Sequence, residues 1–201
     1  MNIGIDIDDT ISNTYEYLFN YSQQFDVEVL GKSGEITGLG TSTNHNYFSS
    51  IHNWTDQETE QFLDQYYKDV LTNVKPRLFA PEVLQKLKQE GNHIYLITAR
   101  FPHKSVEDVS ELTAEWLKEN HIPYDELIIN AQDKLEVAKE KKIDIFIDDS
   151  FKNCKAMADH QIKSILMDTR NNEKLQADNI ERAYSWPQLK KKLEDYQEKK
   201  I

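Results

Sequence analysis

The sequence contains little of what marks several common protein classes. Its 201 residues include a single cysteine, Cys154, which excludes an internal disulfide. We expect this thiol to be packed within a helix rather than to act as a nucleophile. No apolar run approaches the roughly 20 residues needed to cross a bilayer, and Met1 is followed at once by a strand pattern rather than by a signal peptide. These absences predict a soluble, cytoplasmic protein without a membrane partner.

Positive charge is also scarce. The chain has 24 lysines and arginines against 35 aspartates and glutamates, a formal net charge of −11, which disfavours binding to a nucleic acid polymer. The lysines near the C-terminus are expected on the solvated face of a terminal helix. The length allows one domain, or a core domain with a small insertion, and it is compatible with a homodimer.

The most informative feature that is present is Asp6-Ile7-Asp8-Asp9-Thr10, which directly follows the apolar run Ile3-Gly4-Ile5. Acids two positions apart at the tip of a buried strand direct their carboxylates at one point, where like charges raise each other's pKa. Such crowding calls for a cation. A hard ion that prefers oxygen ligands, such as Mg²⁺, is the usual answer.

Three further polar signals follow predicted buried strands. Thr98-Ala99-Arg100 comes after residues 93–97, a helix carrying Lys134 comes after residues 127–129, and Asp148-Asp149 comes after residues 143–147. In an open parallel sheet the carboxyl ends of the strands share one edge, where ligands bind. We therefore expect these groups to meet Asp6 and Asp8.

From residue 79 onward, short apolar runs alternate with helical patterns, which favours an α/β fold with a parallel sheet. Pro81 is expected to open one helix and Ser105 to cap the next. Further strands are expected near residues 127–129, 143–147 and 165–167. A last helix is expected from about Trp186 to Lys199.

Residues 11–78 interrupt this alternation, because no second core strand follows the first for nearly seventy positions. The segment is rich in aromatic residues and predicts two helices, near 12–25 and 55–72. Four of the six glycines fall between them, at Gly31, Gly34, Gly38 and Gly40, which is typical of a turn-rich or mobile connection.

In this order, the acids of residues 6–10, Thr98, Lys134 and the pair Asp148-Asp149 resemble the motifs of the haloacid dehalogenase superfamily of phosphohydrolases. The resemblance spans residues 1 to about 170. It implies a Rossmann-like parallel sheet flanked by helices, with a small helical cap inserted after the first strand. The corresponding division is an α/β core of residues 1–11 and 79–201 and a cap of residues 12–78.

The chemistry expected of these residues is phosphomonoester hydrolysis in two displacements, with Asp6 as the nucleophile that forms an aspartyl phosphate. The resemblance implies that Asp8 is the general acid and base. For Mg²⁺ we expect the Asp6 side chain, the Asp8 backbone carbonyl and Asp149 as ligands, with Asp148 behind them or exchanged with Asp149.

The expected phosphate-binding groups are the Thr98 hydroxyl, the Lys134 ammonium and backbone N–H groups around Asp8, Asp9, Ala99 and Arg100. The Arg100 side chain is either an additional phosphate or ribose contact or an exposed salt-bridge former.

Within the superfamily, the sequence is most similar to bacterial relatives of the 5'(3')-deoxyribonucleotidases. The similarity lies in the Asp-Ile-Asp-Asp-Thr start, the size of the insert, and the Leu-Ile-Thr-Ala-Arg and Phe-Ile-Asp-Asp-Ser segments. It implies a nucleotide substrate. Aromatic residues of the cap could stack on its nucleobase. They are Tyr15, Phe19, Tyr47, Phe48 and Trp54, and the alternative for each is a place in the cap's own hydrophobic core.

Two other functions stay open at this point. A sugar phosphate or another small metabolite could be the substrate of the same core. A non-catalytic phosphate-binding protein or a receiver-like module is the alternative outside enzymology, although a receiver carries its acid pair on the first strand rather than after the lysine.

Overall fold

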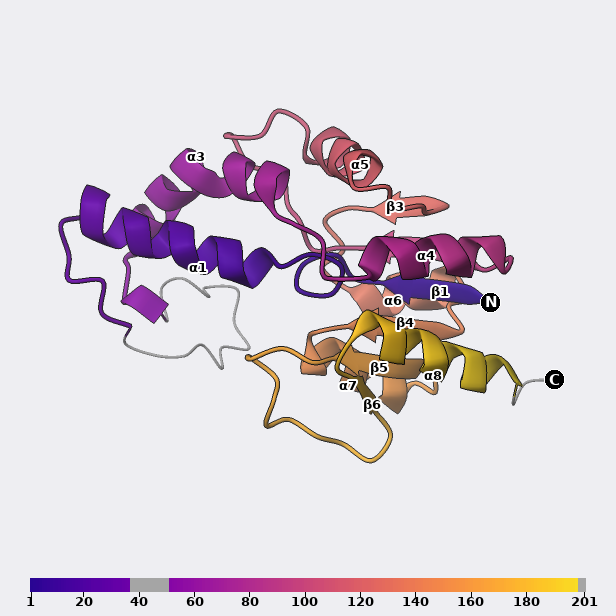
Figure 1. Cartoon of the computed structure of the whole chain (residues 1–201). Helices are drawn as coiled ribbons and strands as arrows, with labels where there is room; N and C mark the ends of the chain where they lie inside the picture. Colours follow the sequence, from indigo (N-terminus) through magenta and orange to yellow (C-terminus); the bar gives the residue numbers. More distant parts are fainter. Residues whose placement is uncertain (37–50, 199–201) are drawn as a thin grey trace.

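A computed structural model describes residues 1–36 and 51–198. In this part of the chain, six parallel strands form one sheet in the order β3-β2-β1-β4-β5-β6 (Figure 1). The strands are β1 (Asn2–Ile5), β2 (His93–Ile97), β3 (Glu126–Ile128), β4 (Ile145–Asp148), β5 (Lys163–Met167) and β6 (Glu181–Ala183). The expected α/β fold with a parallel sheet is confirmed.

Alternation of side chains along the central strands divides the core into two layers. Ile3 and Ile5 of β1 belong to the larger apolar cluster, whereas Phe146 of β4 belongs to the cluster on the opposite face. Successive side chains of a strand point to opposite faces, and both faces are covered here, so the middle parts of β1, β2, β4 and β5 are mainly apolar. The strands therefore end in buried positions from which the polar residues that follow can reach each other.

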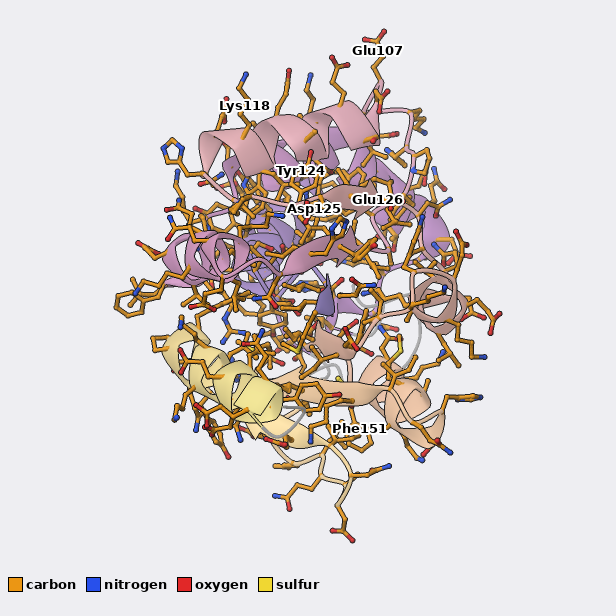
Figure 2. All side chains as sticks on the ribbon, turned by 90° about the vertical axis from the view of Figure 1, so that its right-hand side faces the viewer. Glu107, Lys118, Tyr124, Asp125, Glu126 and Phe151 are labelled. Carbon is orange, nitrogen blue, oxygen red and sulfur yellow. The ribbon has the colours of Figure 1, made fainter. Side chains whose placement is uncertain are left out.

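Helices cover both faces of the sheet. The larger cluster includes apolar residues of α4 (Ala80–Gln89), α5 (Val109–Glu119) and α8 (Trp186–Glu198), and the smaller cluster includes those of α6 (Lys134–Glu140) and α7 (Phe151–Asp159). Figure 2 shows α5 above β3 at one end of the sheet, with Glu107 and Lys118 projecting outward, and Phe151 near the other end. Among the described residues, no helix is both long and apolar enough to span a membrane.

The cap lies beyond the carboxyl ends of the strands (Figure 1). It consists of α1 (Thr14–Gln24), which continues into the short π-helix η1 (Phe25–Val29), and α3 (Asp56–Asn73), which Thr55 begins with a capping box to Glu58. Phe25, Phe62 and Tyr66 form its apolar core. The helical cap after the first strand is confirmed, whereas the division of the chain at residues 11 and 78 stays a prediction.

One local expectation was wrong, and one strand was not expected. Asp108 rather than Ser105 caps α5, because its carboxylate accepts the N–H groups of Ser110 and Glu111. The strand expected near residues 127–129 is present as Glu126–Ile128. The edge strand β6 has too few apolar residues to be recognised from its sequence.

Gly4 should be intolerant of even one added methyl group. A Cβ at this position would lie 2.8 Å from Phe146 Cδ2 and 3.2 Å from Ile143 Cγ2. We expect Gly4→Ala to lower the free energy of unfolding by about 1–3 kcal/mol, measured by urea denaturation. In the double variant with Phe146→Leu, the loss should be smaller than the sum of the two single losses. Strictly additive losses would show that the clash is not the cause.

Candidate active site

The site is centred on an ion pair between Asp6 and Lys134. Asp6 follows β1, and its backbone N–H donates to the carbonyl oxygen of Ile147, 2.9 Å away, so the sheet itself holds it in place. Lys134 is the first residue of α6, and its buried Nζ lies 2.5 Å from Asp6 Oδ1 and 2.9 Å from Asp148 Oδ2. Burial alone would lower the pKa of Lys134, but Asp148 and Asp6 outweigh it and raise this pKa, so the lysine stays charged.

Three carboxylates crowd around this lysine. Asp6, Asp148 and Asp149 each offer an oxygen atom, and these atoms all lie within 4.8 Å of one another. Burial raises the pKa of Asp6 to about 8 against the opposing charge of Lys134, and Asp148 adds to the rise. Burial also raises the pKa of Asp149, with Asp9 as the next cause. A single ammonium cannot neutralise three carboxylates, so the group calls for additional positive charge.

The Asp148 carboxylate accepts hydrogen bonds from three protein donors. Besides Lys134, its carboxylate accepts the backbone N–H of Ser150 at 2.7 Å and the Asn153 side-chain amide at 2.9 Å. Ser150 also caps α7, so the acidic pair is connected to the start of a helix. These contacts direct Asp148 toward Lys134 and α7.

Asp149 differs from its neighbour. Within residues 1–36 and 51–198, no donor reaches its carboxylate, while its backbone carbonyl accepts from Asn172 Nδ2 at 2.7 Å. In the same ranges, the backbone carbonyl of Asp8 also has no donor. These groups offer only oxygen atoms: the carboxylates of Asp6 and Asp149 and the backbone carbonyl of Asp8. Oxygen is the ligand atom that Mg²⁺ prefers. The residues present fit the ion expected from the sequence.

Asp8 is held by a second ion pair. Arg100 approaches it with two nitrogens, Nε at 3.0 Å from Oδ2 and Nη2 at 2.9 Å from Oδ1. The hydroxyls of Thr14 and Thr98 also donate to this carboxylate, at 2.7 and 3.3 Å. Burial alone would raise the pKa of Asp8, but Arg100 outweighs it and lowers this pKa.

Arg100 is not the exposed salt-bridge former that the sequence left open. Its side chain is 1% exposed, its Nη1 donates to Thr113 Oγ1 at 3.3 Å, and its guanidinium carbon lies 5.4 Å from the centre of the Trp116 ring. These partners hold its charge on Asp8. The proposed contact of its side chain with phosphate or ribose stays a prediction.

Several backbone N–H groups are available beside these acids. Those of Asp8, Asp9 and Ala99 donate to no acceptor in the described part of the chain, whereas that of Arg100 donates to Thr98 Oγ1 at 3.2 Å. Asp9 adopts a left-handed conformation with φ of +60°, which turns the chain sharply after Asp8. The free N–H groups form a suitable cradle for an anion.

Two residues that connect the loops at this edge of the sheet, Arg77 and Asn172, could not be identified from the sequence. Arg77 donates to the backbone carbonyls of Asp9, at 2.8 Å, and Asp168, at 3.0 Å, and so joins the loops after β1 and β5. Asn172 is buried and binds the backbone at Asp149 and Met167. Neither residue belongs to a motif, and their partners are backbone atoms that no sequence pattern identifies.

The cap aromatics divide into two groups. Tyr15 and Phe19 are half-buried and stack one helical turn apart on α1, and the Tyr15 N–H donates to Asp9 Oδ1 at 2.7 Å. Trp54 instead lies in the cap core against Phe25. Its indole donates to a buried carboxylate, so it takes the alternative place that the sequence left open. Tyr47 and Phe48 lie outside the described residues.

Comparisons with known proteins agree with this geometry. A model of the family described as 5' nucleotidase, deoxy (pyrimidine), cytosolic type C protein (NT5C) matches residues 1–195. A nucleotidase of Clostridium acetobutylicum is 30% identical over 190 residues, which cover 94% of this chain and 91% of that protein.

Solved structures show the same fold at low sequence identity. A haloacid dehalogenase hydrolase from Entamoeba histolytica has a TM-score of 0.66 at 14% identity, covering 92% of this chain and 93% of that one. CbbY from Rhodobacter sphaeroides, in complex with phosphate, has a TM-score of 0.64 at 13% identity, covering 94% and 95%. The match of the family model over residues 1–195 shows that the chain belongs to the cytosolic type C 5' nucleotidase (NT5C) family and is a hydrolase of phosphomonoesters.

Proposed function

We propose that this protein is a Mg²⁺-dependent nucleotidase that hydrolyses (deoxy)nucleoside monophosphates through an aspartyl phosphate on Asp6. The observation that carries the proposal is the crowding of Asp6, Asp148 and Asp149 around the single ammonium of Lys134. The family description and the name of the clostridial relative support the nucleotide as substrate.

Asp6, Asp149 and the Asp8 backbone carbonyl would hold the metal ion. In residues 1–36 and 51–198, each has an oxygen atom that accepts no hydrogen bond, whereas the Asp148 carboxylate accepts from three donors. When bound, Mg²⁺ would supply positive charge to the phosphoryl oxygens and to the crowded carboxylates. Lys134 supplies positive charge to Asp6 directly, through its contact with Asp6 Oδ1.

In the first displacement, an Asp6 carboxylate oxygen attacks phosphorus and the bond from phosphorus to the ester oxygen breaks. Asp8 gives a proton to the departing alkoxide. Lys134 fixes the Asp6 carboxylate, and the free N–H groups of Asp8, Asp9 and Ala99 stabilise the charge on the phosphoryl oxygens. Thr98 would join them when its hydroxyl, which donates to Asp8 in this structure, turns to a phosphoryl oxygen.

In the second displacement, Asp8 takes a proton from water as the water oxygen attacks phosphorus. The bond between phosphorus and Asp6 breaks, which returns the Asp6 carboxylate and releases inorganic phosphate. Arg100 favours the ionised form of Asp8 that this step requires, because its guanidinium bonds to both carboxylate oxygens.

Tyr15 and Phe19 are the candidates for contact with the nucleoside. They lie on the cap helix that begins directly after the Asp8 turn, and Tyr15 is hydrogen-bonded to Asp9. Their stacked rings are half-buried rather than enclosed in the cap core. Aromatic faces of this kind can stack on a nucleobase.

The first test is phosphate release from nucleoside 5'- and 3'-monophosphates and from sugar phosphates, with Mg²⁺ and with EDTA. We expect turnover of nucleotides that needs Mg²⁺ and falls at least about a thousandfold in Asp6→Asn, because the nucleophile is lost. Turnover mainly of sugar phosphates would change the proposed substrate and leave the proposed mechanism in place. Full activity in Asp6→Asn would contradict the aspartyl phosphate.

The role of Asp8 as an acid predicts a dependence on the leaving group. Asp8→Asn should lower kcat/KM for a nucleoside monophosphate by about 10²–10⁴-fold, because the alkoxide needs a proton. For p-nitrophenyl phosphate the loss should be much smaller, since the phenolate leaves without one. Asp6→Asn is the control, because it should impair both substrates alike. Equal losses for both substrates in Asp8→Asn would argue against this role.

The two late acids should respond oppositely to substitution. At pH 8 in EDTA, Asp149→Asn should raise the free energy of unfolding by about 1 kcal/mol or more. Burial raises the pKa of Asp149 in the folded protein, so at a pH above the pKa of the unfolded chain this carboxylate makes folding less favourable. The substitution removes that cost. Asp148→Asn should lower the free energy of unfolding by about 1–3 kcal/mol, because it weakens the hydrogen bonds that the carboxylate accepts from Lys134, Ser150 and Asn153. Thermal and urea denaturation measure both effects.

The same pair of variants tests the metal assignment. Mg²⁺ should raise the melting temperature of the wild-type protein and should have little effect on Asp149→Asn, which lacks the proposed ligand. An undiminished response of Asp149→Asn to Mg²⁺ would exclude Asp149 as a ligand.

A further inference from the structure

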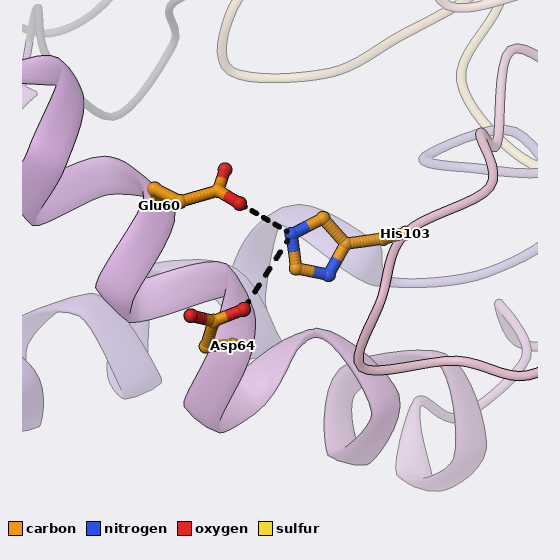
Figure 3. A group of neighbouring side chains, drawn as sticks. All are labelled: Glu60, Asp64 and His103. Carbon is orange, nitrogen blue, oxygen red and sulfur yellow. Dashed lines mark ion pairs between the residues drawn. The ribbon is translucent and has the colours of Figure 1, made fainter.

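A second group of candidate metal ligands lies at the junction of cap and core, away from Asp6. Glu60 and Asp64 lie one turn apart on α3, and His103 lies on the loop between β2 and α5. Figure 3 shows both carboxylates directed toward the His103 ring. Nε2 of His103 is 3.4 Å from Glu60 Oε1 and 3.9 Å from Asp64 Oδ1, and the three ligand atoms lie within 4.8 Å of one another.

His103 is held in place by its surroundings. Its side chain is 8% exposed, and its ring stands edge-on to that of Tyr67, with the centroids 5.7 Å apart. Its Nδ1 lies 2.8 Å from Ser105 Oγ, which donates to the Leu63 carbonyl at 3.2 Å. Because the serine proton is used there, a proton on Nδ1 can be donated to Ser105 Oγ. Metal-bound histidines usually have such a partner for the second ring nitrogen.

In the tautomer with the proton on Nδ1, the lone pair of His103 Nε2 faces the carboxylates of Glu60 and Asp64. The atom is buried and has no hydrogen-bond partner in the described part of the chain. The backbone N–H of Ser105 lies 3.2 Å from Nδ1 and favours the other tautomer, in which Nε2–H would face Glu60. The tautomer with the proton on Nδ1 would leave Nε2 able to bind a metal ion, whereas the tautomer with the proton on Nε2 would make a hydrogen-bonded pair with Glu60.

The separations fit a tetrahedral ion. Two ligand atoms bound to Zn²⁺ at roughly 2.0–2.2 Å lie about 3.4 Å apart. The His103–Glu60 distance already has this value, and the Asp64 carboxylate, 41% exposed, is free to turn inward. One imidazole and two carboxylates favour Zn²⁺ over Mg²⁺ or Ca²⁺, which prefer oxygen ligands alone.

Lys104 is the competing cation. Its Nζ lies 3.0 Å from Glu60 Oε1 and 3.0 Å from Asp64 Oδ2, and its side chain is 61% exposed. Exposed ion pairs of this kind contribute little to stability, so a divalent ion could displace the ammonium.

We propose that Glu60, Asp64 and His103 bind Zn²⁺ and thereby join cap helix α3 to the loop that carries Arg100. This site is independent of the proposed catalytic reaction. Zn²⁺ would strengthen a junction that Tyr67 already makes, since its hydroxyl donates to the Phe101 carbonyl at 3.2 Å.

Zn²⁺ binding to the full chain is measured by calorimetry in excess Mg²⁺, which occupies the catalytic ligands. Co²⁺ absorption then reports the coordination geometry. His103→Gln and Glu60→Gln should each weaken Zn²⁺ binding by at least about tenfold and abolish the tetrahedral Co²⁺ spectrum. Lys104→Met should tighten binding, because it removes the competing charge. His93→Gln is the matched control, since His93 also faces an acid, Asp125, at 3.8 Å, but is half exposed and has no second carboxylate.

Circular dichroism establishes that each variant is folded, and Glu60→Gln at the surface keeps the test valid if His103→Gln fails to fold. Unchanged Zn²⁺ affinity in Glu60→Gln, or Lys104→Met that binds no more tightly than the wild type, would reduce the group to an ion-pair cluster. Absence of saturable Zn²⁺ binding by the wild type would overturn the proposal outright.

Discussion

The edge of the sheet at the carboxyl ends of its strands depends on the ion pairs of the buried Lys134 ammonium. This ammonium joins the residue after β1 to the last residue of β4 from the first turn of α6, so three separate elements converge on one atom. Buried charges are tolerated only when they are paired and hydrogen-bonded. The sheet makes this pairing geometrically accessible, because its parallel strands deliver their polar ends to the same edge.

A second buried pair, between Arg100 and Asp8, gives the neighbouring acid a different environment. The protein groups raise the pKa of Asp6 and lower that of Asp8, the reverse of what the proposed nucleophile and the proposed proton donor need. A divalent ion beside Asp6 and a phosphate dianion beside Asp8 would each act in the needed direction. The ligands of this edge are therefore expected to set the protonation states that the reaction uses.

The sequence was sufficient for the parts of the structure that depend on periodicity and on strand ends. It predicted the parallel sheet, the cap and the meeting of Asp6, Lys134 and Asp148. It could not predict that Arg100 turns inward, because that orientation depends on Trp116 and Thr113 from another element. Contacts to backbone carbonyls, such as those of Arg77, leave no mark in the sequence at all.

The three tryptophans occupy three distinct parts of the molecule. Trp54 lies in the cap core, and Trp186 donates to the Thr10 carbonyl in the turn after β1. Trp116 donates to the carbonyl of Val74, where α3 ends, and also lies beneath Arg100. Intrinsic fluorescence from single-tryptophan versions of this chain would thus report separately on the cap interior, the turn after β1 and the junction at the end of α3, without any attached label.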